Sequence, residues 1–381
     1  MFESLSSNGA PSACLSRAGE LILHLGRLIE LTRALPNAIN ENIGCLAKRL
    51  AHWLLLLLHN TISKQLIDKD YQVKHSISGI WPILYAFFDG NDRLDRAAMR
   101  RQAEICIAGG GKGMAVMGLA TEVAKLSATE RAMVVEWAAE DLAGRIPLAV
   151  TIFGATPQEQ SAAVTHAAAN GAQWVVLQPP RTPGITEAEL IRFFGKVIEH
   201  SPIPAGIQNA PELIGLGLTP TGIATLARNH DNFTVLKGEG PATLIAQIVE
   251  ETEGKLSILN GRGGLELPDN LRAGCSGLVP ALDCFETQVK IYNAMKDGDE
   301  TKAEQLYRDI LPAIVFVMQS VDHLICYGKR IVAARMGIEV FDRAPGLLPN
   351  QFGLEVVRRF SASLGSYSDV TPTSTGDAIG Q

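Results

Sequence analysis

Short apolar runs alternate with helical stretches over most of this chain, and this alternation constrains the fold more than any other feature. Each run has six to ten residues and is followed by a stretch typical of a helix, such as RAAMRRQAEICIAGG. The eight runs are 79–88, 113–118, 147–154, 174–180, 204–210, 233–239, 257–263 and 276–282. Strands that alternate with helices predict parallel strand–helix–strand units.

Eight such units within about 200–250 residues indicate a (β/α)8 TIM barrel, which we predict over residues 77–300. An open doubly wound sheet is the alternative, but it would normally carry a glycine-rich phosphate turn after an early strand, and we find none. Residues 301–365 predict a C-terminal helical extension packed on the barrel. The Leu-rich segment 1–76 predicts a helical N-terminal extension, which could be upstream sequence outside the functional protein, and the polar segment 366–381 predicts a disordered tail.

Composition and charge exclude several classes of protein. The chain of 381 residues is 46% apolar with a net charge of −6, whereas nucleic-acid binders usually carry a basic surface. No apolar run reaches the ~18 residues of a membrane helix. The most apolar run, 50–59, predicts an apolar helix face, with docking on a membrane surface as the alternative. Six scattered cysteines without a CxxC motif favour reduced thiols and a cytoplasmic location.

Sequence motifs for metals and cofactors are missing. The eight histidines show no HExxH spacing and no Cys/His cluster, and a GxSxG elbow is absent. The glycines of 108–113 resemble a phosphate loop only superficially, because they precede a strand and no Ser or Thr follows the Gly–Lys pair. They predict the end of a helix. We therefore expect neither a metal nor a bound cofactor.

A lysine ends the sixth apolar run. In a TIM barrel, chemistry takes place where strands end and the loops toward the helices begin, and Lys237 stands at such a position. An amine in apolar surroundings is disfavoured as an ammonium ion, and a neutral amine can attack a ketone to form a Schiff base. The alternative is a surface lysine that extends its charged end into solvent. The strand count and the position favour the Schiff-base lysine.

Two further strand ends carry candidate substrate-binding groups. Arg262 follows the seventh run among glycines, where a guanidinium could hold a substrate carboxylate through two parallel hydrogen bonds; a solvated loop arginine is the alternative. After the second run, the amides of Leu119, Ala120 and Thr121 and the Thr121 hydroxyl could cradle a small carboxylate. A polar helix N-cap at Thr121 is compatible with that role.

Several motifs in this order resemble the dihydrodipicolinate synthase / N-acetylneuraminate lyase family of pyruvate-dependent class I aldolases. The resemblance runs from about 77 to 364 and includes VMGLATEVAKLSATER, VVLQPPRTP, IQNAPELIGLGLTP, VLKGEGP and YGKRIVAARMGI. It implies a TIM barrel, a Schiff base on Lys237 with a pyruvate-type 2-keto acid, and a homo-oligomer, commonly a tetramer, with a dimer as the alternative.

The same comparison predicts a divergent member. The family motif Gly-Thr-Thr-Gly-Glu is replaced by 118–122, which retains a hydroxyl only at Thr121. Gln208 stands where the family has its proton-shuttling tyrosine, and Leu213 where dihydrodipicolinate synthases carry an arginine for the aldehyde's carboxylate. Pro179 and Pro180 replace the aromatic pair of the proton relay.

These departures argue against a true dihydrodipicolinate synthase. We expect a lyase, either an aldolase or a dehydratase, that acts on a small-molecule 2-keto acid, with Lys237 forming the imine. Glutamine cannot act as a general acid, so the proton donor is predicted to be Tyr85, at the end of the first run, or a water held by Gln208. The alternative function is a keto-acid-binding or regulatory barrel that has lost turnover.

Overall fold

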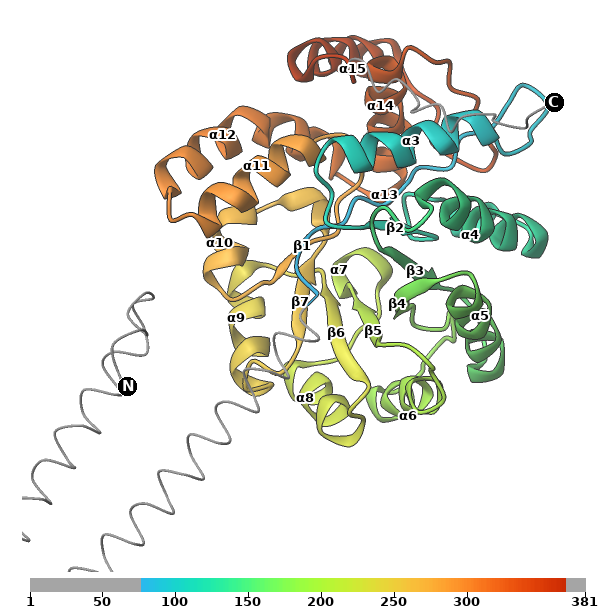
Figure 1. The fold of residues 1–381 in the computed structure, drawn as a ribbon, viewed down its shortest axis with the longest axis vertical. Coiled ribbons are helices and arrows are strands. Elements are labelled where there is room, and N and C mark those ends of the chain that lie inside the picture. The colour runs from blue at the N-terminus through green and yellow to red at the C-terminus, as the bar shows by residue number, and fades with distance from the viewer. Residues whose placement is uncertain (1–76, 368–381) are drawn as a thin grey trace, which may run out of the picture. The chain divides into compact units, whose positions relative to one another are not determined.

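Eight parallel strands form the centre of the protein, as seen in a computed structural model that describes residues 77–367 (Figure 1). The strands follow the order β1-β8-β7-β6-β5-β4-β3-β2. Isolated parallel bridges join Ile83 to Ala281 on one side and to Ala115 on the other, which closes the sheet. This closure confirms the predicted (β/α)8 barrel and excludes the open doubly wound sheet.

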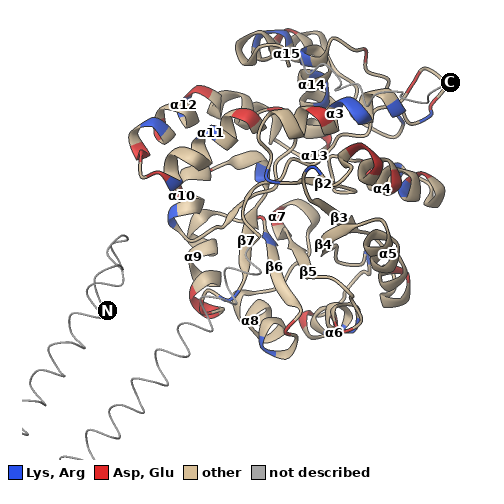
Figure 2. Ribbon diagram, viewed as in Figure 1, with Lys and Arg blue, Asp and Glu red and all other residues tan. Residues whose placement is uncertain are grey.

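Each strand overlaps one of the eight predicted runs and is shorter than its run; β4 begins two residues before the predicted start at 174. Their bounds are β1 Gly79–Ile80, β2 Met114–Val116, β3 Leu148–Ile152, β4 Ala172–Leu177, β5 Ala205–Asn209, β6 Phe233–Gly238, β7 Ser257–Asn260 and β8 Gly277–Leu278. In these strands Lys237 is the only charged residue. Figure 2 shows that Lys, Arg, Asp and Glu gather instead on the surrounding helices.

Helices follow the strands and surround them (Figure 1). Several begin at residues suited to cap a helix: Ser127 and Thr186 form capping boxes with Glu130 and Glu189. The helical bounds are α3 Arg96–Ala108, η1 Val123–Lys125, α4 Ala128–Leu142, α5 Pro157–Ala169, α6 Glu187–Ile198, α7 Pro211–Ile214, α8 Pro220–Asn229, α9 Ala242–Glu251, η2 Arg262–Gly264, α10 Leu267–Arg272 and α11 Phe285–Lys296. The glycines of 108–113 end α3 and lead into β2, as predicted.

Further helices follow the barrel, as predicted for residues 301–365. They are α12 Glu300–Val317, α13 Val321–His323, the π-helix η3 Leu324–Gly328, α14 Lys329–Met336 and α15 Gln351–Leu364. The predictions for 1–76 and 368–381 lie outside the described residues. The predicted start of the tail at 366 is wrong, because the Tyr367 hydroxyl donates to the Leu282 carbonyl at 2.6 Å and Arg335 stacks on its ring.

The helices of the described residues differ from membrane-spanning helices in length and composition. None of their helices is by itself long and apolar enough to cross a bilayer; only the sharply bent pair Glu300–Val317 and Val321–Met336 reaches the required length and composition when taken together. The apolar run 50–59 lies outside the described residues.

Glycine permits the close approach of β1 to β8 at the seam of the barrel. A Cβ atom at Gly277 would lie 2.0 Å from the Gly79 carbonyl oxygen, which is backbone and cannot move aside alone. At Gly90, by contrast, a Cβ atom would make ordinary contact with the Phe341 ring at 3.6 Å. The seam therefore requires glycine at 277.

We expect Gly277→Ala to separate β1 from β8 and to destabilise the protein by about 1–3 kcal/mol or more. Urea denaturation of the full chain measures this as a lower unfolding midpoint. Gly90→Ala is the matched control, with a midpoint close to wild type. Equal midpoints for the two variants would contradict the close approach of β1 to β8.

Candidate active site

A small cavity of about 40 Å³ opens at the carboxyl ends of the strands. Its polar lining consists of Lys237, Glu239 and Arg262. Its apolar lining includes Leu119 and Ala120 from the loop after β2, Leu213 from α7, and Met318, Val321 and Leu324 from the C-terminal helices. The C-terminal extension therefore forms part of the wall beside Lys237.

Lys237 is paired with a carboxylate inside the barrel. Its Nζ lies 2.6 Å from Oε1 of Glu239, and both side chains are about 95% buried. Lys237 is in register with Gln208 on β5 and with Leu259 on β7. Burying two charges costs free energy that their attraction offsets only with good geometry and further hydrogen bonds. The pair therefore needs additional hydrogen-bond partners.

Amides from two neighbouring strands hold the carboxylate. Gln208 Nε2 donates to Glu239 Oε2 at 3.2 Å, and Gln178 Nε2 donates to Gln208 Oε1 at 2.9 Å. Gln208 is the middle member of this series of hydrogen bonds and does not line the cavity. Both ends of its amide are thus engaged, which makes it a positioning group for Glu239 and leaves it poorly suited to hold the water that we predicted.

Glycine makes room for the Glu239 carboxylate. A Cβ atom at Gly261, directly after β7, would lie 2.3 Å from Glu239 Oε1. The carboxylate therefore rests against bare backbone on one side and Lys237 on the other. Glu239 is a site residue that our prediction from the sequence missed. It directly follows β6, and its spacing of two from Lys237, which places both on one face of an extended strand, could have indicated it.

The loop after β2 contributes unequally to the cavity. Leu119 and Ala120 line it, but Thr121 does not, because its hydroxyl donates to the Leu84 carbonyl at 2.7 Å. The Thr121 amide bonds to Gly118 within the loop. Among the described residues, the amides of Leu119 and Ala120 donate no hydrogen bond. The structure therefore does not support the predicted carboxylate-binding role of Thr121.

Arg262 lines the cavity but already has carboxylate partners. Its guanidinium lies 3.1 Å from Glu266 and 3.3 Å from Glu212 on α7. A guanidinium carries five N–H donors, so donors remain for a substrate. The backbone of Arg262 has φ 50°, a strained conformation for a residue other than glycine, which fixes where its side chain begins.

Tyr85 lies away from the cavity, contrary to our prediction that it serves Lys237. It is completely buried, its hydroxyl bonds Asp283 at 3.2 Å, and it packs against Gly328. Burial, together with the neighbouring Asp283, raises the pKa of Tyr85 well above its usual value. The physical reason for the misassignment is that the segment after β1 directs this ring toward Asp283, beyond β8, and toward Gly328 at the end of η3, and not into the cavity lining.

A wider cleft of about 780 Å³ adjoins the small cavity. Leu119, Leu213 and Val321 line both spaces. The remaining wall comes from the ends of β3 and β4 and from the segment after α7. This cleft connects the surroundings of Lys237 with the exposed side of the barrel mouth.

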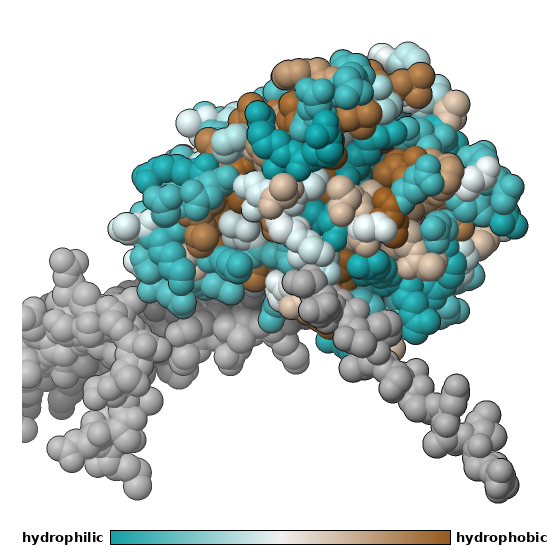
Figure 3. Space-filling view, turned by 90° about the horizontal axis from the view of Figure 1, so that it is seen from above, coloured by the Kyte–Doolittle hydropathy of each residue, from teal (hydrophilic) through white to brown (hydrophobic). Residues whose placement is uncertain are grey.

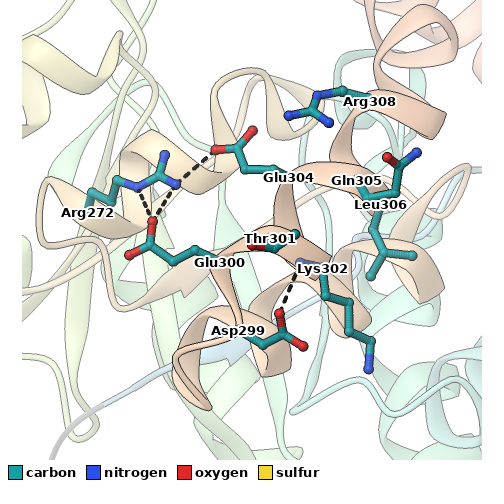
Figure 4. Close-up of a pocket in the computed structure, with 9 residues that line it drawn as sticks. All are labelled: Arg272, Asp299, Glu300, Thr301, Lys302, Glu304, Gln305, Leu306 and Arg308. Carbon is teal, nitrogen blue, oxygen red and sulfur yellow. Dashed lines mark hydrogen bonds and ion pairs between the residues drawn. The ribbon is translucent and has the colours of Figure 1, made fainter.

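Another hollow, of about 590 Å³, lies on the outside of the protein at the start of α12 (Figure 4). Its charges compensate one another: Arg272 forms ion pairs with Asp269, Glu300 and Glu304. It holds no buried pair like that of the barrel mouth. Residues 77–367 also contain no cluster of three His, Cys, Asp or Glu side chains placed to hold a metal.

Comparison with known proteins identifies the relatives of this chain. The model of the Dihydrodipicolinate synthetase family matches residues 76–347. A 4-hydroxy-tetrahydrodipicolinate synthase from Methanothrix thermoacetophila is 28% identical over 239 residues, which cover 62% of this chain and 80% of that protein. An L-2-keto-3-deoxyarabonate dehydratase from Azospirillum brasilense is 26% identical over 245 residues, which cover 62% of this chain and 78% of that protein. The solved 4-hydroxy-tetrahydrodipicolinate synthase from Methylacidiphilum fumariolicum shares the fold, with a TM-score of 0.71 and 22% identity over 76% of this chain and 96% of that one.

We expect Tyr85→Phe to leave turnover nearly unchanged, because the hydroxyl bonds Asp283 and not a cavity group. The variant leaves a buried carboxylate with one donor fewer, which costs about 1–3 kcal/mol and lowers the melting temperature. Tyr367→Phe, which removes another buried hydroxyl, is the matched control. A large loss of turnover in Tyr85→Phe alone would restore Tyr85 as the proton donor.

Proposed function

Because this chain belongs to the dihydrodipicolinate synthetase family and is therefore a lyase, we propose that Lys237 forms a Schiff base with a pyruvate-type 2-keto acid. The observation that carries the proposal is the buried Lys237–Glu239 pair, with Nζ and Oε1 2.6 Å apart in a cavity at the carboxyl ends of the strands. A buried ion pair is often neutral or unfavourable for stability. Unlike other buried pairs of the described structure, this pair lines a cavity at the barrel mouth, and that position is better explained by chemistry.

Glu239 supplies the proton transfers that imine formation needs. Its carboxylate removes a proton from the Lys237 ammonium, and the neutral amine attacks the C2 carbonyl to give a carbinolamine. The proton then passes from Glu239 to the carbinolamine oxygen, which leaves as water as the imine forms. This assignment replaces Tyr85 and uses Gln208 to hold the carboxylate in place.

The imine then accepts the electron pair of a broken bond. In aldol cleavage of a 4-hydroxy-2-keto acid, the C3–C4 bond breaks, the 4-hydroxyl proton moves to Glu239 and C4 leaves as an aldehyde. In dehydration, C3 loses a proton to Glu239 and the C4 hydroxyl leaves as water. Protonation at C3 where needed and hydrolysis of the imine then free Lys237. Product analysis distinguishes pyruvate plus aldehyde from a dehydrated keto acid.

Carboxylate binding is assigned to the loops after β2 and β7. Leu119, Ala120 and Arg262 line the cavity together. In the proposed mode, the amides of Leu119 and Ala120 and the remaining N–H donors of Arg262 bind the carboxylate. Leu213 offers no positive charge to a second carboxylate, which supports a role other than dihydrodipicolinate synthesis. We assign no part in binding to Thr121.

A cytoplasmic homo-oligomer fits this proposal. Cys106, Cys275, Cys284 and Cys326 are buried free thiols, and burial raises the pKa of Cys275 to about 12, which keeps that thiol protonated. Large apolar side chains, with Leu348 75% and Phe352 73% exposed, offer a surface for a second copy. Figure 3 shows apolar patches within a largely hydrophilic face. Size-exclusion chromatography with light scattering measures the assembly.

Borohydride trapping tests the imine. We expect sodium borohydride with pyruvate to add a mass to the peptide that contains Lys237, and Lys237→Arg to abolish it. Lys329 is the internal control, because it is also fully buried and paired with a glutamate, Glu122, and burial lowers its pKa, yet it lies outside the cavity lining. An adduct on Lys329, or none at all, would favour the binding or regulatory barrel.

We expect Glu239→Gln to slow imine formation by ~10²–10⁴, the usual contribution of a general acid–base group. Stopped-flow measurement of imine formation with pyruvate gives the rate. Asp141→Asn is the matched control, since it neutralises another buried carboxylate, which pairs with Arg96 on an outer helix. A rate within a few-fold of wild type in Glu239→Gln would remove Glu239 from the mechanism.

A further inference from the structure

The route from Lys237 to the surface is lined by apolar side chains. A keto acid bound to Lys237 fills the small cavity with its carboxylate and carbonyl, so the rest of the molecule must extend into the adjoining cleft of about 780 Å³. The residues common to both spaces are Leu119, Leu213 and Val321. All three are half-buried and none offers a hydrogen bond from its side chain.

The wall of the cleft beyond these three residues is also mainly apolar. Beyond the entrance it presents Phe153, Pro179, Pro180, Ile185 and Leu216. The charged side chain of this wall is Arg181, which is exposed and lies 6.0 Å over the Phe153 ring. The Gln178 side-chain amide is directed to Gln208, and Thr182 is exposed.

The cleft is also held in shape before any ligand binds. Asn209 accepts a hydrogen bond from the Leu218 amide at 2.7 Å and donates to the Leu218 carbonyl at 3.1 Å, which fixes both ends of the segment that carries Leu213 and Leu216. Two consecutive prolines restrict the opposite wall. Because the cleft is preformed, little ordering is needed when a ligand binds. Its mainly apolar lining suits an apolar ligand.

We propose that the substrate is a 2-keto acid whose chain beyond C4 is apolar, an alkyl or aryl group, and that this group occupies the cleft. The inference rests on the proposed Schiff-base function. A polyhydroxylated sugar acid needs a hydrogen-bond partner for each hydroxyl that it buries, and the described wall provides few. The chain would thus differ in specificity from a relative named for a 3-deoxy sugar acid.

Competition between two substrate series tests the proposal with the full-length protein. One series carries propyl, butyl or phenyl at C4 of 4-hydroxy-2-oxobutanoate, and the other carries polyhydroxylated chains of matched length. Mass spectrometry follows the consumption of each compound, which detects cleavage and dehydration alike. We expect kcat/KM to be at least tenfold higher for the apolar series and to rise with each added methylene, which is worth about 10–200-fold in an apolar pocket.

A variant of the wall provides the second measurement. Leu216→Gln is expected to lower the ratio of apolar to polyhydroxylated kcat/KM at least fivefold, with a melting curve to confirm that it folds. Leu347→Gln changes a leucine outside the cleft and should keep the wild-type ratio. A preference for the polyhydroxylated series, or an unchanged ratio in folded Leu216→Gln, would overturn the apolar-chain proposal.

The test of the Schiff base is independent of the test of the apolar chain. Borohydride trapping uses pyruvate, which has no chain beyond C3 and does not reach the cleft. If pyruvate is trapped on Lys237 and polyhydroxylated acids are preferred, the proposed function stands and the apolar-chain proposal is wrong. If pyruvate is not trapped, the proposed function fails, whichever series binds.

Discussion

One buried ion pair organises the open end of this barrel. Lys237 is the only charged residue in the eight described strands, and its sole carboxylate partner in the described structure, Glu239, comes from the end of the same strand. Isolated, either charge would be very costly to bury. Together they require an opposing hydrogen-bond donor from Gln208, a bare backbone at Gly261 and a water-poor wall. The surrounding sequence supplies each of these conditions.

The departures from the family pattern become coherent around this pair. Where relatives of this fold family are expected to place a tyrosine, Gln208 holds the Glu239 carboxylate. In the proposed mechanism, the carboxylate two residues after the lysine moves the protons, so that no phenol is needed at that site. The apolar replacements Leu213 and Pro180 lie in the adjoining cleft. In the proposed mechanism, one change relocates proton transfer, and the others alter what the cleft can accommodate.

Much of the architecture was predictable from the sequence because short buried strands and amphipathic helices leave a periodic signal. The eight runs, the barrel and the C-terminal helices follow from it, and the position of Lys237 follows from the strand-end rule. The directions of the side chains beyond the strands could not be predicted from the sequence. Tyr85 and Thr121 follow β1 and β2 in the sequence, yet their hydroxyls bond Asp283 and the Leu84 carbonyl. Which face a residue presents just beyond a strand depends on tertiary contacts that a linear pattern does not contain.

The pairing of β1 with β8 affects how the protein folds during its synthesis. Gly79 pairs with Gly277, so roughly 200 further residues must be synthesised after β1 before its partner strand β8 exists. At a synthesis rate of ~5–20 residues per second, that interval lasts about 10–40 s. During translation the nascent chain therefore carries two unpaired sheet edges rich in apolar residues, and its yield in the cell depends on keeping them apart from other chains until the last strand emerges.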